Sequence, residues 1–306
     1  MDSPVLLIIF NREDTARQVF ERIRDARPPR LYIAADGPRD GIINDSDKCA
    51  ATRQVVEVVD WPCDVHRLYR DENLGCGLGP AKAISWFFDH EEQGIVLEDD
   101  CLPHPDFFSY CDDLLSRYRN DDRISVISGR NPFGRYQEGS GSYFLSALHF
   151  NWGWASWRRV WCHYDYYLSD VTLSQYAKSL FSLFGFSPYL IIWRLYRFLV
   201  CKLNVEESSW WDYQFAVMTQ LYKSYTIVPM INMVTNIGFD ERATHTFNKN
   251  TNDIKALSIY PLVHPAKLKY SPGFDIEHSK HRYKKSRLLL SFIKALLSYK
   301  LRRKSI

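Results

Sequence analysis

Short apolar runs alternate with amphipathic stretches through the first hundred residues of the chain. The runs predict strands and the amphipathic stretches predict helices, with strands at residues 4–10, 30–36, 63–70 and 94–100 and helices at residues 14–26, 47–59 and 79–90. Strands that alternate with helices are joined by crossover connections. The pattern therefore predicts an α/β fold with a mostly parallel central sheet and helices on both faces.

After these elements the alternation weakens. Residues 105–119 predict another helix, and residues 123–129 predict another strand. Residues 179–204 are largely apolar but are interrupted by Gly185 and Pro188 and carry several basic side chains. They predict a pair of helices that is partly buried or faces a membrane, without spanning it.

The net charge of +3 is unevenly divided along the chain. Residues 279–306 hold ten Lys and Arg and no Asp or Glu, which leaves a net charge of −7 on the rest. Such a division argues against a nucleic-acid-binding fold, whose positive charge lies on the fold itself. Residues 280–304 place apolar side chains at helical spacing among Lys and Arg, which is typical of a helix on an anionic membrane surface. A tail helix that packs on the fold is the alternative.

The cysteine and aromatic contents indicate which kinds of site and ligand to expect. The seven cysteines include no CxxC pair, so neither a zinc knuckle nor a disulfide framework is indicated, and a reducing cytosol is expected. The first apolar run, residues 5–10, is far shorter than the roughly 20 residues of a spanning helix. Aromatic residues make up 15% of the chain, which suits a protein that stacks rings on sugars or bases.

The carboxyl ends of the predicted strands are where a ligand is expected in such a sheet. The last of the first four strands runs directly into Glu98, Asp99 and Asp100. Adjacent carboxylates repel one another unless a cation or hydrogen-bond donors lie nearby. A hard divalent metal, which commonly uses one or two carboxylates with substrate phosphates, would relieve this repulsion. A solvated acidic loop, with Asp99 or Asp100 capping the next helix, is the alternative.

The other strand ends are suited to hold a nucleotide. Asp36 can accept hydrogen bonds from a base or a ribose, and Gly37 permits close approach of a backbone. Candidates for phosphate or ring contacts are Arg12, Arg39 and Arg70. The glycines of NLGCGLG precede a predicted helix and offer either a backbone anion site or an ordinary turn. They match neither the dinucleotide-binding nor the P-loop pattern.

Seven segments of the chain resemble motifs of one enzyme family. They are FNRED, AADGPR, ENLGCG, VLEDDCLPHPDFF, GWASW, WWDYQF and VTNIGFDERATHT. They are similar to the inverting, metal-dependent glycosyltransferases of the GT-A fold, chiefly to the N-acetylglucosaminyltransferase I group and to bacterial sugar transferases of polysaccharide loci. The resemblance covers roughly residues 4–247 and is most specific at EDD and at NIGFDERATHT. It implies a GT-A fold, which is Rossmann-like, and a UDP-sugar donor.

The resemblance also implies roles for single residues. Asp100 would bind Mn2+ or Mg2+, while Glu98 and Asp99 face the sugar and ribose of the donor. Asp36 would bind the uracil. Asp212 would be the general base, although Tyr213 stands where the family often has a second acid. The remaining expected donor contacts are Asn11, Arg12, Arg70, Asn73 and Gly75.

An inverting transfer needs a base on the acceptor side and charge neutralisation on the leaving side. Asp212 stands between Trp211 and Tyr213, where desolvation would raise its pKa toward useful basicity, although it could equally be a helix N-cap or a surface aspartate. His245 is a candidate second contact to the metal or the diphosphate, with a structural role as the alternative. Trp154, Trp210 and Trp211 are expected to bind sugars by stacking, with core packing as the alternative.

Together the residues and the resemblance predict a metal-dependent glycosyltransferase. It would move N-acetylglucosamine or another hexose from UDP to a glycan, expected to be lipid-linked, in bacterial surface polysaccharide synthesis. Two alternatives stay open: a non-catalytic nucleotide- or glycan-binding module on the same fold, and a sugar nucleotidyltransferase. The last needs a glycine-rich loop with a basic residue after the first strand, which FNRED does not provide.

The sequence also predicts how the chain is organised and where the protein is located. We expect a catalytic domain over residues 1–278, made of a nucleotide-binding half, residues 1–130, and an acceptor-side half, residues 131–278. The basic tail, residues 279–306, would contact an anionic membrane. The protein would then be cytoplasmic, peripheral to the inner face of the cell membrane, and without a nucleic-acid partner.

Overall fold

One mixed sheet forms the centre of the computed structural model, which describes residues 1–185, 187–204, 209–238, 254–280 and 285–302. Within these residues the strand order is β3-β2-β1-β4-β8-β6-β9-β7. In chain order the strands are β1 (Val5–Ile9), β2 (Arg30–Ala35), β3 (Asp64–Tyr69), β4 (Gln93–Glu98), β6 (Ile124–Ser128), β7 (Tyr143–Ser146), β8 (Trp154–Trp157) and β9 (Tyr225–Pro229). A separate antiparallel pair joins β5 (Cys101–Pro103) to β10 (Val234–Asn236).

The first hundred residues build the parallel half of the sheet. β3, β2, β1 and β4 are parallel neighbours. They are connected through α1 (Glu13–Ala26), α2 (Asp45–Val55) and α3 (Gly75–His90). β1 is buried on both sides because Val5, Leu7 and Ile9 pack into one core cluster and Leu6 into another. The predicted α/β fold, with a central sheet flanked by helices and a helical C-terminal segment, is confirmed.

The second half of the chain continues the same sheet with changes of direction. β8 is antiparallel to both of its neighbours, β4 and β6. β6 and β9 are parallel, and β7 is antiparallel to β9. Parallel contacts thus remain the more frequent kind, and β8 ties the second half of the chain directly to β4.

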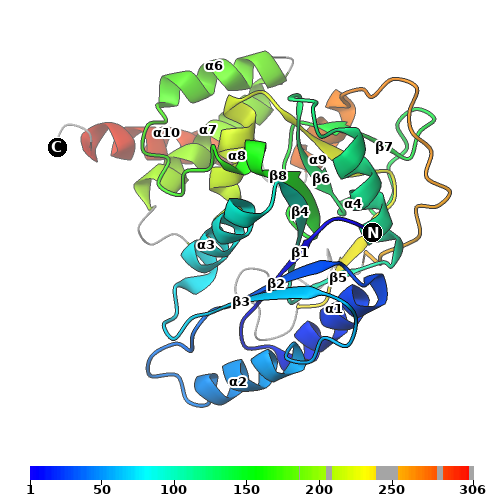
Figure 1. Ribbon diagram of the computed structural model, residues 1–306. Helices are drawn as coiled ribbons and strands as arrows, with labels where there is room; N and C mark the ends of the chain where they lie inside the picture. Colours follow the sequence, from blue (N-terminus) through cyan, green and yellow to red (C-terminus); the bar gives the residue numbers. More distant parts are fainter. Residues whose placement is uncertain (186, 205–208, 239–253, 281–284, 303–306) are drawn as a thin grey trace.

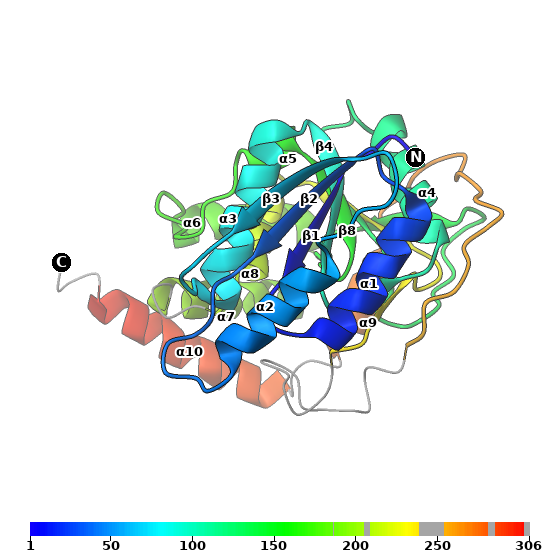
Figure 2. The same cartoon turned by 60° about the horizontal axis from the view of Figure 1, so that its bottom comes forward.

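Helices cover both faces of the sheet (Figures 1 and 2). α1 and α4 (Asp106–Arg117) contribute buried side chains to the cluster on one face. α3, α5 (Arg158–Trp161) and α8 (Asp212–Leu221) contribute to the cluster on the other face. The amphipathic stretches of the sequence therefore bury their apolar sides against the strands.

A third core cluster lies among the later helices. It joins α6 (Leu173–Phe184), α7 (Pro188–Leu203), α9 (Pro272–Lys280) and α10 (Lys285–Arg302). The predicted pair of helices at residues 179–204 corresponds to α6 and α7, and the tail forms α10, which packs on α7. In the part of the chain that the structure describes, no helix is both long and apolar enough to cross a bilayer.

Candidate functional site

The ends of β1, β2, β3 and β4 meet at one edge of the sheet, because these strands are parallel neighbours. β1 and β4 lie side by side there. The backbone N–H of Phe10, which follows β1, donates a hydrogen bond of 3.0 Å to Oδ2 of Asp99, which follows β4. This is the edge at which parallel α/β sheets bind their ligands.

Three half-buried carboxylates dominate this edge. Burial, and then the neighbouring charge of Asp100, raises the pKa of Asp99 to about 7. Burial, followed by the charges of Asp100 and Asp99, raises the pKa of Glu98 well above its usual value. Burial also raises the pKa of Asp100, against the opposing effect of Arg12. A group of carboxylates with raised pKa values favours a proton or a cation in their place.

Arg12 and Gly238 enclose Asp100. Nη1 of Arg12 lies 3.4 Å from Oδ2 of Asp100 and donates to the carbonyl of Gly238, also at 3.4 Å. The Asn236 side chain hydrogen-bonds to Asp100, which favours the ionised carboxylate. A Cβ on Gly238 would lie 2.4 Å from Oδ2 of Asp100 and 2.5 Å from Nη1 of Arg12, so a larger residue here would displace these side chains. The segment after β10 thus reaches the acidic edge directly.

Asp36, at the end of β2, organises the next part of the edge. Its Oδ2 accepts hydrogen bonds from the backbone N–H groups of Leu74 and Gly75, at 2.8 and 3.0 Å. Burial raises the pKa of Asp36, although these bonds and the charge of Arg70 oppose the rise. Its Oδ1 lies 3.6 Å from Nη1 of Arg70. Both carboxylate oxygens of Asp36 are therefore turned toward groups of the chain itself, Oδ2 toward the two amides and Oδ1 toward Arg70.

The glycines after Asn73 do not precede the helix as expected. α3 begins at Gly75, so Gly75, Gly77 and Gly79 all lie in its first turns. The helix begins early because Asp36 binds the amides of Leu74 and Gly75, which favours a helix N-terminus. The glycines were expected ahead of the helix and lie inside it, while the backbone anion site stays a prediction.

Other residues expected to contact a donor are held by internal bonds. Nδ2 of Asn11 donates to Asp45 at 2.6 Å. Arg39 donates to the same carboxylate through Nε and Nη2, at 3.0 and 2.8 Å, and these bonds hold the pKa of Asp45 well below its usual range. Nδ2 of Asn73 donates to the Gly37 carbonyl at 2.7 Å.

Gly37 permits a close backbone approach, but to the chain itself. A Cβ there would lie 2.4 Å from the carbonyl oxygen of Asp71. The N–H of Gly37 also donates to the Glu72 carbonyl at 3.1 Å. The glycine is therefore required by the packing of two strand ends against each other.

Asp212 is brought to the acidic edge from far along the sequence. It is the first residue of α8, preceded by Trp211 at the N-cap, and no side-chain cap bond is formed there. The charge of Asp212 contributes to the raised pKa of Glu98, after burial and the charges of Asp100 and Asp99. An acidic residue of the second half of the chain is thus within electrostatic range of the triplet of the first.

The tryptophans expected to stack on sugars divide into two groups. Trp154 and Trp211 are 0% and 3% exposed, with their rings 5.8 Å apart in the core. Neither ring has a face open to a sugar, so core packing is the correct interpretation for both. Trp210 is half-buried and meets Tyr213 edge to face at 5.7 Å.

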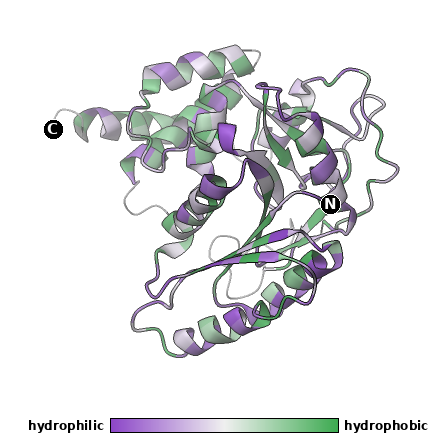
Figure 3. Cartoon of the chain, viewed as in Figure 1, coloured by the Kyte–Doolittle hydropathy of each residue, from purple (hydrophilic) through white to green (hydrophobic). Residues whose placement is uncertain are grey.

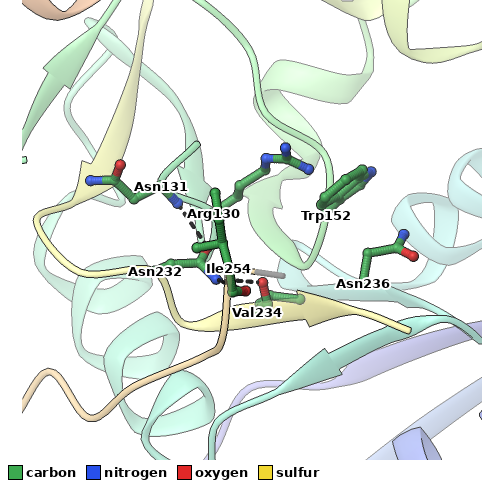
Figure 4. Close-up of a pocket in the computed structure, with 7 residues that line it drawn as sticks. All are labelled: Arg130, Asn131, Trp152, Asn232, Val234, Asn236 and Ile254. Carbon is green, nitrogen blue, oxygen red and sulfur yellow. Dashed lines mark hydrogen bonds between the residues drawn. The ribbon is translucent and has the colours of Figure 1, made fainter. Parts of the chain in front are cut away.

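A pocket that the sequence did not reveal lies beside the acidic edge (Figure 4). The guanidinium of Arg130 lies over the ring of half-buried Trp152, 3.2 Å from its centroid. Asn236 lines the same pocket and connects it to Asp100. The full lining is Arg130, Asn131, Trp152, Asn232, Val234, Asn236 and Ile254. Arg130 follows closely after β6. The rule that ligands bind beyond strand ends would therefore have predicted it as a candidate binding residue.

The carboxylates fit a divalent cation of a particular kind. Among the residues with a described position, no group of three or more His, Cys, Asp or Glu side chains is arranged to hold a metal ion. A cation that is held by one carboxylate and by the phosphates of a substrate needs no such group. Asp100 offers that carboxylate, and the raised pKa of its neighbours favours a positive charge beside them. His245 lies outside the described residues.

Comparisons with known proteins identify no family. No family model and no curated protein matches the sequence. Among solved structures, a UDP-glucose pyrophosphorylase complexed with UDP-glucose is similar over 78% of this chain and 94% of its own, with 9% identity and a TM-score of 0.41. HddC from Yersinia pseudotuberculosis covers 52% of this chain and 78% of its own, with 10% identity and a TM-score of 0.32. The 4-diphosphocytidyl-2C-methyl-D-erythritol synthase from Anaerococcus prevotii covers 60% and 84%, with 9% identity and a TM-score of 0.35.

The raised pKa of Asp99 predicts a pH dependence of stability. Between about pH 4 and pH 7 the folded protein keeps a proton on Asp99 that the unfolded chain has lost, so this residue makes the free energy of unfolding fall as the pH rises. The slope is at most about 1.4 kcal/mol per pH unit.

Asp99→Asn, whose side-chain oxygen can still accept the hydrogen bond from the Phe10 amide, should flatten this slope when unfolding by urea is measured without added metal. Asp122→Asn, at a 97% exposed side chain, should keep it. An unchanged slope in Asp99→Asn would contradict the assignment.

Proposed function

We propose that this chain is a GT-A glycosyltransferase, which moves a sugar from a UDP-sugar to a glycan acceptor with inversion at the anomeric carbon. The observation that carries the proposal is that the charge of Asp212 acts on Glu98 and helps to raise the pKa of that carboxyl. The acidic group at the start of α8 is therefore within electrostatic range of the acidic triplet at the end of β4. An inverting displacement needs these two features, a base on one side and a site for the leaving diphosphate on the other.

The donor would lie along the ends of β1, β2 and β4. Asp36 would accept a hydrogen bond from an N–H of the uracil through Oδ1, which would exchange its contact with Arg70 for one with the base. Glu98 and Asp99 would face the sugar and ribose hydroxyls, for which carboxylates are strong acceptors. The side-chain amide of Asn11 is held in place by its hydrogen bond to Asp45. Its proposed contact with the donor would therefore be made in this fixed orientation.

Asp100 would hold the Mn2+ or Mg2+ ion, whose chemistry is to neutralise charge on the diphosphate. Arg12 lies 3.4 Å from the same carboxylate and adds a permanent positive charge on that side. His245 is proposed as a further contact to the metal or the diphosphate. Arg12, Asp100 and Gly238 therefore form the leaving-group side of the proposed site.

Asp212 would act on the acceptor side. In the proposed step the acceptor hydroxyl oxygen forms a bond to the anomeric carbon, the bond from that carbon to the UDP oxygen breaks, and the hydroxyl proton passes to Asp212. Trp210 and Tyr213 flank this side, and the half-buried Trp152, which carries the Arg130 guanidinium on one face of its ring, replaces Trp154 as a candidate for sugar stacking. N-acetylglucosamine is the first donor sugar to test, and bacterial surface polysaccharide synthesis in the cytoplasm is the proposed setting.

Nucleotidyl transfer is the competing activity. β1 and α1 are joined by only residues 10–12, which leaves no room for the glycine-rich basic loop that this activity needs after the first strand. An assay with UTP and a sugar 1-phosphate separates the two activities. Release of diphosphate in that assay would favour the competing one.

Substitutions at the two acidic sites should have different effects. Asp100→Asn should abolish the Mn2+-dependent part of UDP binding, because the proposed ligand of the cation is lost. Asp212→Asn should leave the Kd for UDP unchanged and lower kcat on the order of 10²- to 10⁴-fold, because only the base is removed. Calorimetric titration and a donor-transfer assay measure the two effects. Equal loss of UDP affinity in both variants would refute the division of roles, and a variant that binds UDP but never transfers would favour the binding module.

Gly238→Ala tests the leaving-group side in another way. The new methyl group would push apart Arg12 and Asp100, so UDP affinity with Mn2+ should fall about tenfold or more. Gly273→Ala is the matched control, because its Cβ would meet only the Tyr136 hydroxyl, at 3.2 Å, in α9. Undiminished UDP binding in Gly238→Ala would show that this contact does not shape the site.

A further inference from the structure

α10 carries a row of exposed apolar side chains along its outer side. The row, here called the outer strip, has exposed fractions from 44% to 67% and consists of Leu289, Leu290, Ile293, Leu297 and Leu301. At 100° per residue these positions fall within an arc of about 120°. Contiguous exposed apolar surface of this kind marks a site of interaction.

The opposite side of α10 is packed against the protein. Leu288 and Ala295 are buried, and Phe292, Leu296 and Tyr299 pack against the same core cluster, which α7 also lines. The helix is therefore fixed on the fold by one apolar side. The outer strip is a second apolar side, beyond what packing on α7 requires.

The charge around the outer strip selects its partner. Lys294 and Lys300 are exposed on α10, and residues 279–306 hold ten basic and no acidic residues. A second copy of the same helix would bring two basic surfaces together, which is unfavourable. An anionic lipid surface instead offers phosphate groups to the lysines and an acyl layer to the leucines. Figure 3 shows both hydrophilic and hydrophobic positions along this helix.

We infer that α10 lies on an anionic membrane, with the outer strip inserted at the boundary of headgroups and acyl chains. The helix lies along the surface and does not cross it, since it is not both long and apolar enough to span. Packing on α7 holds the rest of the protein in one orientation on the bilayer. The two apolar sides of α10 thus have separate tasks, one toward the fold and one toward lipid.

This orientation brings the acceptor side of the site to the membrane. α10 packs on α7, and α7 packs on α8, whose first residue is Asp212. The Arg197 guanidinium of α7 lies 3.5 Å from the ring centroid of Tyr213, which follows Asp212. α1 and α2 lie at the far end of the molecule from α10 (Figure 1). If the proposed transferase activity holds, its acceptor is a glycan carried on a lipid in that membrane.

Vesicle co-sedimentation of the full chain tests the inference. The protein should bind vesicles made of two parts phosphatidylcholine and one part phosphatidylglycerol, bind less as salt rises, and not bind phosphatidylcholine alone. The triple variant Leu290→Glu, Leu297→Glu, Leu301→Glu should lose binding by about tenfold or more, because it places charge in the acyl layer. The matched control, Ile42→Glu, Ile43→Glu, Val58→Glu, adds the same charge at side chains that are 51% to 85% exposed near α2 and should bind as the parent does.

Three results would overturn the inference: no binding of the parent chain to the anionic vesicles, equal binding by the two triple variants, or a parent dimer in sedimentation velocity that the α10 variant abolishes. Circular dichroism confirms that both variants are folded. Hydrolysis of the UDP-sugar in solution should be equal in all three proteins, because the outer strip is outside the catalytic site. Hydrolysis without docking would refute the membrane alone, and docking without hydrolysis would refute the transferase alone.

Discussion

The mutual repulsion of Glu98, Asp99 and Asp100 is the constraint on which the rest of the candidate site depends. Parallel strands end together, so β4 delivers three carboxylates to an edge where water is partly excluded. The Phe10 amide and Arg12 supply part of the compensation, and the pKa of Asp99 is still raised to about 7. An arrangement that leaves this much charge uncompensated is costly for folding alone and is typical of a functional site.

The later half of the chain completes this edge because of one strand. β8 inserts between β4 and β6 and runs antiparallel to both. The second half therefore packs directly beside the first, with α8 on one face and β10 beside Asp100. Asp212 and Gly238 reach the triplet by these two routes. α7 then links α8 to α10, so the same packing connects the site to the outer strip of the tail.

The sequence predicted what depends on local pattern and on strand order. The first four strands and the positions at their ends follow from apolar runs and from the geometry of parallel sheets. Burial depends on the whole fold. The residues next to Trp154 and Trp211 in the sequence therefore did not indicate that both side chains lie in the core. The early start of α3 depends on Asp36, which comes from a different strand. Arg130 was not predicted as a binding residue, because the end of the strand before it was not considered as a place where a ligand could bind.

Calorimetric titration of the wild-type chain with UDP, with and without Mn2+, tests the central claim most directly. We predict that UDP binds tightly only when Mn2+ is present, because the diphosphate and Asp100 must share the cation. The affinity should rise with pH as the carboxylates lose their protons. Absence of UDP binding under both conditions, or equal binding with and without the metal, would contradict a cation-dependent nucleotide site at the end of β4.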